Sequence, residues 1–125
     1  MAGTPSDRLS FPRSRRIKHS GDFARARAQG KRVVCGCLIA NWRPLPPGAA
    51  SRLGVVTSKK VGGAVARNRA RRLLRESFRL HQHDLPQPAD FVLVARPSIA
   101  GKAFAEVERD FLRALSQARA LALKP

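Results

Sequence analysis

Acidic residues are scarce in this chain of 125 residues, which holds 8 Asp and Glu against 25 Lys and Arg and carries a formal charge of +17. No apolar run approaches the roughly 20 residues that a membrane-spanning helix requires, which excludes that class of protein. The two cysteines, Cys35 and Cys37, are too few for a disulfide scaffold. Residues 1–12 lack the apolar stretch of a secretory signal. We therefore expect a cytoplasmic protein with no membrane partner.

The positive charge is concentrated in the first two thirds of the chain. Residues 1–83 contain 19 Lys and Arg with three acids, whereas residues 84–125 contain six with five acids. The positive electrostatic field of such a segment attracts a polyanion and can contact many of its phosphates. The alternative is an ordinary protein of Arg-rich composition. In such a protein, however, the positive charges of residues 1–83 would repel one another and destabilise the fold unless a partner neutralised them. The charge pattern therefore favours nucleic-acid binding.

Hydrophobic periodicity and turn residues divide the chain into six elements. Ser20 stands where a helix N-cap is expected, and Gly30 ends the short helix that follows. Three prolines within residues 43–48 end the first strand, and this loop predicts a loose hairpin with the second strand. The predicted elements are a helix at residues 21–29, strands at 33–42 and 52–58, a long helix at 64–83, a strand at 90–96 and a last helix after Gly101.

The order α-β-β-α-β-α predicts an α/β two-layer sandwich, in which the helices pack on one sheet. A single domain is also expected from the length of the chain. Residues 1–17 are polar and basic and include two prolines, which predicts a flexible N-terminal arm. The domain then occupies residues 18–120, and residues 121–125 form a C-terminal tail.

The predicted helix at residues 64–83 has an apolar side and a basic side. At about 100° per residue, its apolar positions form a stripe that can pack on the sheet. Glu76 is its one acid and can pair with Arg72 or Arg79. Phe78 lies near the boundary between the two sides. The basic side comprises Asn68, Arg71, Arg72, Arg75 and Arg79, with Arg67 and Arg69 at its edges.

A charged helical side is often merely solvated, and this is the alternative to a binding site. Here, however, six arginines lie together with one acid between them, so they repel one another in water. Arginine presents a planar fork of donors that grips phosphate through two hydrogen bonds. The pattern therefore predicts contact with a nucleic-acid backbone.

Lys59 and Lys60 stand between the second predicted strand and the long helix. With Gly62 and Gly63, they form a plausible phosphate site beside the positive end of that helix. A plain strand-to-helix turn is the alternative. The segment lacks the spacing of a nucleotide-binding P-loop, so we expect no nucleotide or other small-molecule cofactor.

Taken together, the segments 52–60 and 66–79 resemble the protein component of bacterial ribonuclease P. The resemblance extends from about residue 16 to residue 118, through Asp22, Phe23 and the predicted strand at 91–95. The residues most similar to the signature of that family are Ser58, Lys59 and Lys60, the triplet Arg67-Asn68-Arg69, and the pair Arg71-Arg72.

The resemblance implies a fold and two RNA partners. The family has a small α/β sandwich, similar to a domain of a small-subunit ribosomal protein, with a left-handed crossover between parallel strands. Its members assist the cleavage that matures the 5′ end of tRNA, and the catalytic RNA, not the protein, holds the magnesium ions. Carried over by position, the residues that contact the catalytic RNA are Lys59, Lys60, Arg67, Asn68, Arg69, Arg71, Arg72 and Arg75.

The resemblance also implies a cleft for the 5′ leader of precursor tRNA. Phe23 lies at this cleft, where an aromatic face can stack a base, although a core contact is an equally good role for it. Many members carry a second aromatic residue one helical turn further on, and Arg27 takes that position here. Contact with the leader is then expected to depend more on charge and less on stacking than in those members. Ile39 and Asn41 are expected to line the same cleft.

The sequence shows no protein active site. Hydrolysis of a phosphodiester by a protein usually needs clustered carboxylates with metals, or a pair of histidines. Five of the acids follow residue 83, away from the basic helix, and Glu106 and Asp110 fit a solvated helix face. Cys35 and Cys37 lack the second pair of ligands that a zinc site needs. We expect neither a catalytic residue nor a bound metal in the protein.

Two other functions fit a basic chain of this size. One is a structural ribosomal protein of similar fold, and the other is a DNA-compacting protein without sequence preference. The combination of Ser58-Lys59-Lys60 with Arg67-Asn68-Arg69 argues against both and favours the ribonuclease P protein.

Overall fold

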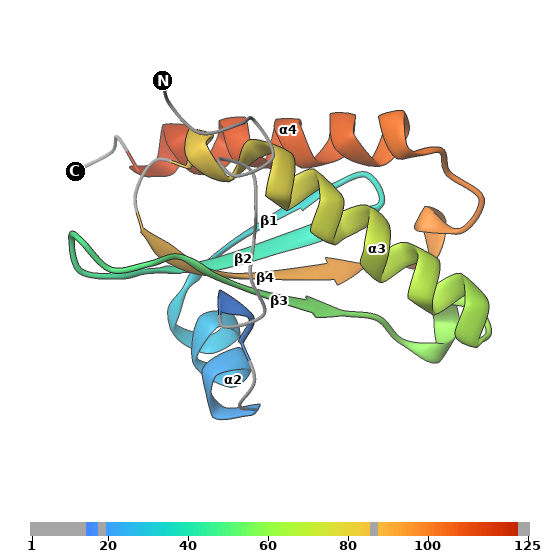
Figure 1. Ribbon diagram of the computed structural model, residues 1–125, viewed down its shortest axis with the longest axis horizontal. Coiled ribbons are helices and arrows are strands. Elements are labelled where there is room, and N and C mark those ends of the chain that lie inside the picture. The colour runs from blue at the N-terminus through green and yellow to red at the C-terminus, as the bar shows by residue number, and fades with distance from the viewer. Residues whose placement is uncertain (1–14, 18–19, 86–87, 123–125) are drawn as a thin grey trace, which may run out of the picture.

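The helices of the chain pack against the two faces of one sheet (Figure 1). The computed structural model describes residues 15–17, 20–85 and 88–122. Short 3-10 turns, η2 (Lys59–Val61), η3 (Gln82–Asp84) and η4 (Pro97–Ile99), connect the longer elements. The longer elements are α2 (Ser20–Gln29), β1 (Lys31–Cys35), β2 (Leu38–Pro44), β3 (Arg52–Val56), α3 (Ala64–His81), β4 (Ala89–Ala95) and α4 (Phe104–Ala122). The predicted α/β sandwich is confirmed.

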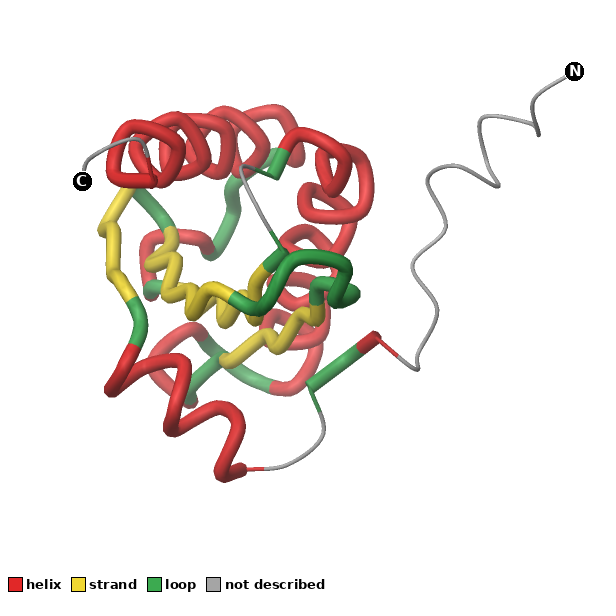
Figure 2. The backbone as a smooth tube through the Cα atoms, turned by 90° about the vertical axis from the view of Figure 1, so that its left-hand side faces the viewer, coloured by secondary structure: helices red, strands yellow, loops and turns green. Residues whose placement is uncertain are grey.

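The sheet has the strand order β1-β2-β4-β3. β2 pairs antiparallel with β1 and β4, whereas β3 pairs parallel with β4. α3 and α4 cover one face of the sheet, and α2 crosses the other (Figures 1 and 2). Viewed from the α3 side with β3 and β4 pointing upward, β4 lies to the left of β3 (Figures 1 and 2). The β3–α3–β4 crossover is therefore left-handed, against the usual rule, as the resemblance implies.

The single strand predicted at residues 33–42 is wrong, because this stretch forms the two strands of a hairpin. Gly36 and Cys37 make the turn between β1 and β2. The φ angle of Gly36 is 53°, in the left-handed region that favours glycine, and a Cβ there would stand 2.2 Å from Asp110 Oδ2. Apolar residues on both sides of the turn make the sequence resemble one continuous strand. The predicted order is therefore one strand short.

The predicted hairpin between β2 and β3 is also wrong, because β4 lies between them. Six of the seven residues of β4 are buried. A strand that is apolar on both faces is stable in the interior of a sheet, where neighbours pair with both of its edges. Local loop length gives no indication of this insertion.

The main core fills the space between the sheet and the helices α3 and α4. Trp42, Phe78, Phe91 and Phe111 form its aromatic centre, and each is at most 2% exposed. Neighbouring ring centroids lie 5.5 to 6.4 Å apart. The helical wheel places Phe78 near the basic side, but it is fully buried. The reason is that α4 packs against α3 and widens the apolar stripe that α3 buries.

A smaller cluster lies on the α2 side of the sheet, where Ile17, Ala26 and Val92 are buried. The backbone N–H of Ile17 donates to the carbonyl oxygen of Leu53 at 2.9 Å, and Arg16 forms a parallel bridge with Leu53. Arg16 and Ile17, which the sequence predicts to lie in a flexible arm over residues 1–17, are therefore bound to β3. The remaining part of that prediction, residues 1–14, lies outside the described residues.

The other predicted domain boundary also shifts slightly. α4 continues to Ala122 and so includes the first two residues of the tail predicted at 121–125. Residues 123–125 lie outside the described residues.

One buried carboxylate joins three strands. Asp90 is fully buried and accepts two hydrogen bonds from Arg52, at 2.8 and 2.6 Å, and one from Arg43, at 3.2 Å. The strand register places both arginines beside Asp90. A carboxylate removed from water requires such partners. The cluster therefore favours the observed order of β2, β4 and β3 at this end of the sheet.

Candidate functional site

The basic side of α3 brings together the residues that the sequence predicts for RNA contact. α3 buries Ala70, Leu74, Ser77 and Phe78, and its basic residues occupy the rest of the helix surface. Asn68 and Arg72 are exposed, and the other members are half-buried. We call the following set the α3 face: Arg67, Asn68, Arg69, Arg71, Arg72 and Arg75.

Hydrogen bonds to neutral partners hold two arginines of the α3 face. Arg71 donates to Thr57 Oγ1, just after β3, at 2.8 Å, and also to the side-chain oxygen of Asn68. Arg69 donates to the carbonyl oxygen of Lys102, in the loop before α4, at 2.7 Å. These partners fix the side chains without cancelling their charge. The α3 face is thus ordered before a ligand arrives, which lowers the entropy cost of binding.

Glu76 neutralises one neighbour of the α3 face. It accepts two hydrogen bonds from Arg79, at 2.6 and 2.8 Å, and these lower the pKa of the Glu76 carboxyl. Burial, followed by the charges of Arg16 and Arg71, lowers the pKa of Arg75. Such crowding of like charges, with few acids to offset it, favours binding of an anion.

Lys59 and Lys60 extend the positive surface beyond the start of α3. Both side chains are exposed on the η2 turn. The Oγ atom of Ser58 accepts the backbone N–H of Lys60 at 3.3 Å and so helps to shape this turn. Gly63, the N-cap of α3, provides no side-chain hydrogen bond to the first N–H groups of the helix. The predicted phosphate site therefore continues directly into the α3 face.

A cleft of about 450 Å³ opens between α2 and the sheet. As predicted, Ile39 and Asn41 line it; the side-chain amide of Asn41 donates to the carbonyl oxygen of Val92 at 3.5 Å. We call this space the α2 cleft, and its lining comprises Ala24, Ala28, Arg32, Ile39, Asn41 and Val94. Sequence reasoning missed four of these residues. The spacing of Ala24 and Ala28, one helical turn apart, was the available signal, because small residues on one helix face leave room beside it.

Phe23 does not line the α2 cleft in this structure. It is half-buried and packs against the cluster of Ile17, Ala26 and Val92. Its ring lies directly against Gly54, where an added Cβ would stand 2.4 Å from Phe23 Cε1. The ring thus anchors α2 to the sheet, and base stacking by its exposed part stays a prediction.

Arg27 lies on α2, one helical turn after Phe23. The position of its side chain lies outside the described part of the chain. Its contact with a leader therefore also stays a prediction.

A second cavity, of about 720 Å³, adjoins the C-terminal half of α3. Sequence reasoning missed it, because it joins α3 to an N-terminal residue and to the first residue of α4. We call it the Arg16 pocket, and its lining comprises Arg16, Arg72, Leu73, Arg75, Glu76, Arg79 and Phe104.

The helix acids include one buried carboxylate that sequence reasoning placed in solvent. Asp110 is 5% exposed and accepts the backbone N–H of Cys37 at 3.0 Å. Burial alone would raise the pKa of Asp110, but the Cys37 hydrogen bonds and the charges of Arg109 and Arg113 bring it below its ordinary value. Burial and contact with Asp110 raise the pKa of the Cys37 thiol to about 12. This pair closes the β1–β2 turn onto α4.

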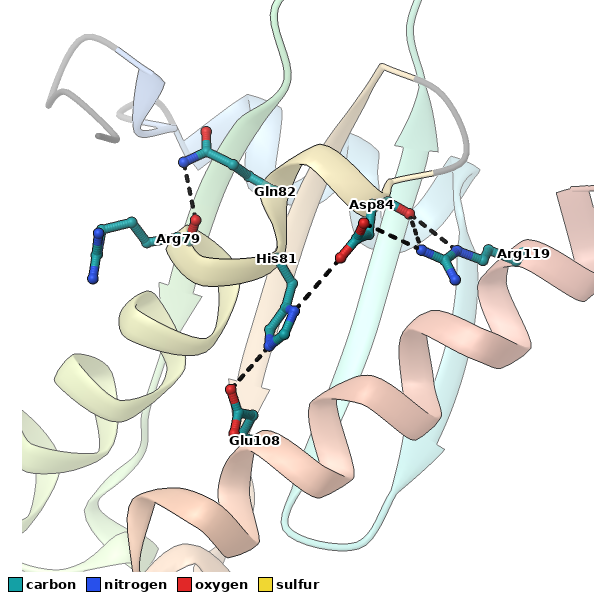
Figure 3. A network of polar contacts seen from close by, with 6 residues as sticks. All are labelled: Arg79, His81, Gln82, Asp84, Glu108 and Arg119. Carbon is teal, nitrogen blue, oxygen red and sulfur yellow. Dashed lines mark hydrogen bonds and ion pairs between the residues drawn. The ribbon is translucent and has the colours of Figure 1, made fainter. Parts of the chain in front are cut away.

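His81 takes part in a contact between helices. Figure 3 shows it between two carboxylates: Nε2 lies 2.9 Å from Glu108 Oε2, and Nδ1 lies 3.6 Å from Asp84 Oδ2. Arg119 donates twice to the carbonyl oxygen of Asp84, at 3.0 and 2.6 Å. The network therefore ties the end of α3 to α4.

Residues 15–17, 20–85 and 88–122 contain no group of three or more His, Cys, Asp or Glu side chains that could hold a metal ion. In the same part of the chain, no helix combines the length and apolarity needed to cross a membrane.

Comparison with known proteins identifies the relatives of this chain. A family model described as Ribonuclease P matches residues 11–119. The ribonuclease P protein component of Ruegeria pomeroyi is 41% identical over 108 residues, covering 83% of this chain and 86% of that protein. The RNase P protein of Staphylococcus aureus matches with a TM-score of 0.76 at 28% identity, over 84% of this chain and 95% of that one. For the RNase P protein of Thermotoga maritima, the TM-score is 0.72 at 28% identity, over 82% and 96%.

Proposed function

The chain belongs to the family of ribonuclease P protein components, and from this premise we propose that it binds both the catalytic RNA of ribonuclease P and the 5′ leader of precursor tRNA. The family name itself places the chain in an endoribonuclease complex of tRNA processing. The α3 face and the lysines of η2 contact the catalytic RNA. The α2 cleft holds the leader.

The α3 face is the observation that carries this proposal. Its arginines lie along one helix, and Arg69 and Arg71 are held by neutral hydrogen-bond acceptors from other elements. Guanidinium groups held in this way present forks of donors that suit the oxygens of phosphate groups. The site neutralises phosphates and stabilises the working shape of the RNA.

The α2 cleft supports the second part of the proposal. It lies beside α2, which packs on the other face of the sheet from α3 (Figure 2), and combines apolar side chains with the charge of Arg32 and the amide of Asn41. A single RNA strand is recognised by such a mixture of stacking and polar contacts. Because mature tRNA has no leader, this contact favours substrate over product.

In this proposal the RNA carries out catalysis and holds magnesium, and the protein acts in the cytoplasm without a cofactor of its own. The engagement of the acids in the fold supports this division of work. Asp90 binds two arginines, Glu76 binds Arg79 and Asp110 binds the turn at Cys37. Carboxylates so engaged are poorly placed to act together on a phosphodiester.

The test measures the affinity of precursor tRNA for the catalytic RNA, with and without the protein and with and without the 5′ leader. We expect the protein to increase the affinity only when the leader is present. Arg72→Gln, on the exposed part of the α3 face, is expected to weaken binding of the protein to the catalytic RNA. Arg109→Gln, an exposed arginine of α4, is the matched control and is expected to leave it unchanged.

Two results would contradict the proposal. An equal gain for both tRNA forms would indicate a general basic RNA-binding protein, such as a ribosomal protein. Equally tight binding to duplex DNA would indicate a DNA-compacting protein. Because binding to phosphates is salt-dependent, all affinities are compared at one ionic strength.

A further inference from the structure

The Arg16 pocket combines apolar surface with positive charge. Leu73 and Phe104 provide its apolar part, and both are half-buried, so each keeps some surface open to a ligand. Its volume of about 720 Å³ lies within the range of roughly 300–1,000 Å³ that is usual for sites of small molecules. The pocket is therefore large enough for one nucleotide and too small for a duplex.

Arg16 reaches the pocket because Ile17 anchors the backbone beside β3. The N–H of Ile17 bonds to the carbonyl oxygen of Leu53, and the Ile17 side chain is buried on the α2 side of the sheet. In extended chain, successive side chains point to opposite faces. Arg16 is therefore directed to the α3 side, where it lines the pocket.

The charge of the pocket is strongly positive. Of its four arginines, Arg79 is bound to the one acid in the lining, Glu76. Among the side chains that the structure describes, none of the acids forms an ion pair with Arg16, Arg72 or Arg75. Arg16, Arg72 and Arg75 line the same pocket, so like charges are held close together. In addition to burial, the charges of Arg16 and Arg71 lower the pKa of Arg75. An anionic group in the pocket would relieve this repulsion.

We propose that the Arg16 pocket binds one unpaired nucleotide of the catalytic RNA, with its base stacked on Phe104 and its phosphates on Arg16 and Arg75. This inference rests on the proposed function and adds to the α3 face a site that takes a base. Aromatic rings are the usual stacking platforms for single-stranded bases.

Glu76 gives the pocket a preference among bases. Its carboxylate oxygens can each accept more than one hydrogen bond, so the bond with Arg79 leaves acceptor capacity. The exocyclic amino group of adenine, cytosine or guanine can donate to such an oxygen, whereas uracil offers only its ring N3–H, which lies between two carbonyl oxygens that the carboxylate repels. The pocket therefore favours a base that carries an amino group.

Phe104→Trp provides a direct test of stacking. The one native tryptophan, Trp42, is 1% exposed and serves as a constant background. We expect the new fluorescence to be quenched by the catalytic RNA and by single-stranded oligo(A), and less by oligo(U). Adenosine monophosphate alone is expected to quench only at much higher concentration. Equal quenching by the free nucleotide and the RNA would overturn the assignment to an RNA nucleotide, and no quenching by any of them would overturn the pocket.

Phe104→Ala tests what the contact contributes to assembly. Loss of one stacked base is expected to raise the Kd for the catalytic RNA about 5- to 100-fold. Leu112→Ala, a half-exposed apolar residue of α4, is the matched control and should stay within about twofold. Thermal melting checks that both variants fold. Arg16→Gln, compared with Arg109→Gln, gives the same test without removing apolar surface.

The two proposals fail in different ways. If wild type and Phe104→Ala bind the catalytic RNA equally while the leader-dependent gain persists, the pocket is overturned and the proposed function stands. If the wild-type protein shows no preference for the catalytic RNA, the proposed function fails. Quenching of the Phe104→Trp variant by oligo(A) would then still decide whether the pocket takes a base.

Discussion

The two faces of the sheet are packed very differently. On the side of α3 and α4, four large aromatic side chains lie in a continuous core that spans the sheet. On the α2 side, the buried cluster among the described residues has three apolar members, and a cleft of about 450 Å³ lies beside them. A dense core holds the backbone of α3 rigidly and so fixes where its arginines stand. The small core on the α2 side leaves space between helix and sheet, which a cleft for single-stranded RNA requires.

Phe78→Ala is expected to have the largest effect on stability. Truncating this fully buried ring should lower the free energy of unfolding by about 3–5 kcal/mol, and urea unfolding followed by circular dichroism measures the change. Phe23→Ala is the matched variant on the α2 side, where the ring is half-buried, and should cost roughly 1–2 kcal/mol. Equal losses would show that the two sides are packed alike.

Arg71→Ala is expected to weaken binding of RNA to the α3 face, on the densely packed side of the sheet. The guanidinium is fixed by Thr57 and Asn68, and the loss of a charged hydrogen bond to phosphate should reduce affinity for the catalytic RNA by about 10- to 100-fold. The slope of log affinity against log salt should fall by about one phosphate contact. Filter binding over a salt series measures both quantities. An unchanged slope would mean that Arg71 serves only to hold Thr57.

Ala28→Leu is expected to weaken only the binding of the leader to the α2 cleft, on the sparsely packed side of the sheet. The larger side chain would fill part of the α2 cleft and reduce the leader-dependent gain in affinity by about tenfold, comparable to the loss of one stacked base. Affinity for leaderless tRNA should not change. Ala105→Leu, on the exposed side of α4, is the control. If both variants keep the full gain, the leader lies elsewhere.

Asp110→Asn is expected to have the smallest effect, about 1 kcal/mol at neutral pH. The folded-state pKa of Asp110 lies below the ordinary value of 3.8. The ionised group therefore stabilises the fold fully above that value, and this contribution is lost as pH falls through the folded pKa. The difference in melting temperature between wild type and variant should thus shrink as the pH is lowered from 7 to 2. A difference that is constant with pH would show that the charge of Asp110 has no role.

Local patterns predicted the long basic helix well, because its register depends on residues three and four apart. α3 begins at Ala64 as predicted and ends at His81, two residues early. Asn68, Arg72 and Arg75 of the α3 face lie opposite its buried stripe. Ile39 and Asn41 were also brought to one cleft. The family resemblance supplied the left-handed crossover, which the general right-handed rule for parallel strands would have argued against.

The features that were missed depend on segments far apart in the sequence. The position of β4 between β2 and β3 follows from its burial on both faces, not from any loop. The turn at Gly36 is hidden among apolar residues and is held by Asp110, which lies on the last helix. The Arg16 pocket needs Ile17 to anchor the N-terminal segment beside β3. None of these contacts leaves a periodic signal.

Gly54 acts as a spacer between β3 and α2. A methyl group at this position would stand 2.4 Å from Phe23 Cε1, far inside van der Waals contact, so alanine would push the ring and its helix away from the sheet. The residues that line the α2 cleft come from α2, β1, β2 and β4. The distance between α2 and the sheet therefore depends on Gly54 having only a hydrogen atom as its side chain. β3 itself provides none of the residues that line the cleft. Substitution of Gly54 would therefore change the width of the α2 cleft without changing any residue that lines it.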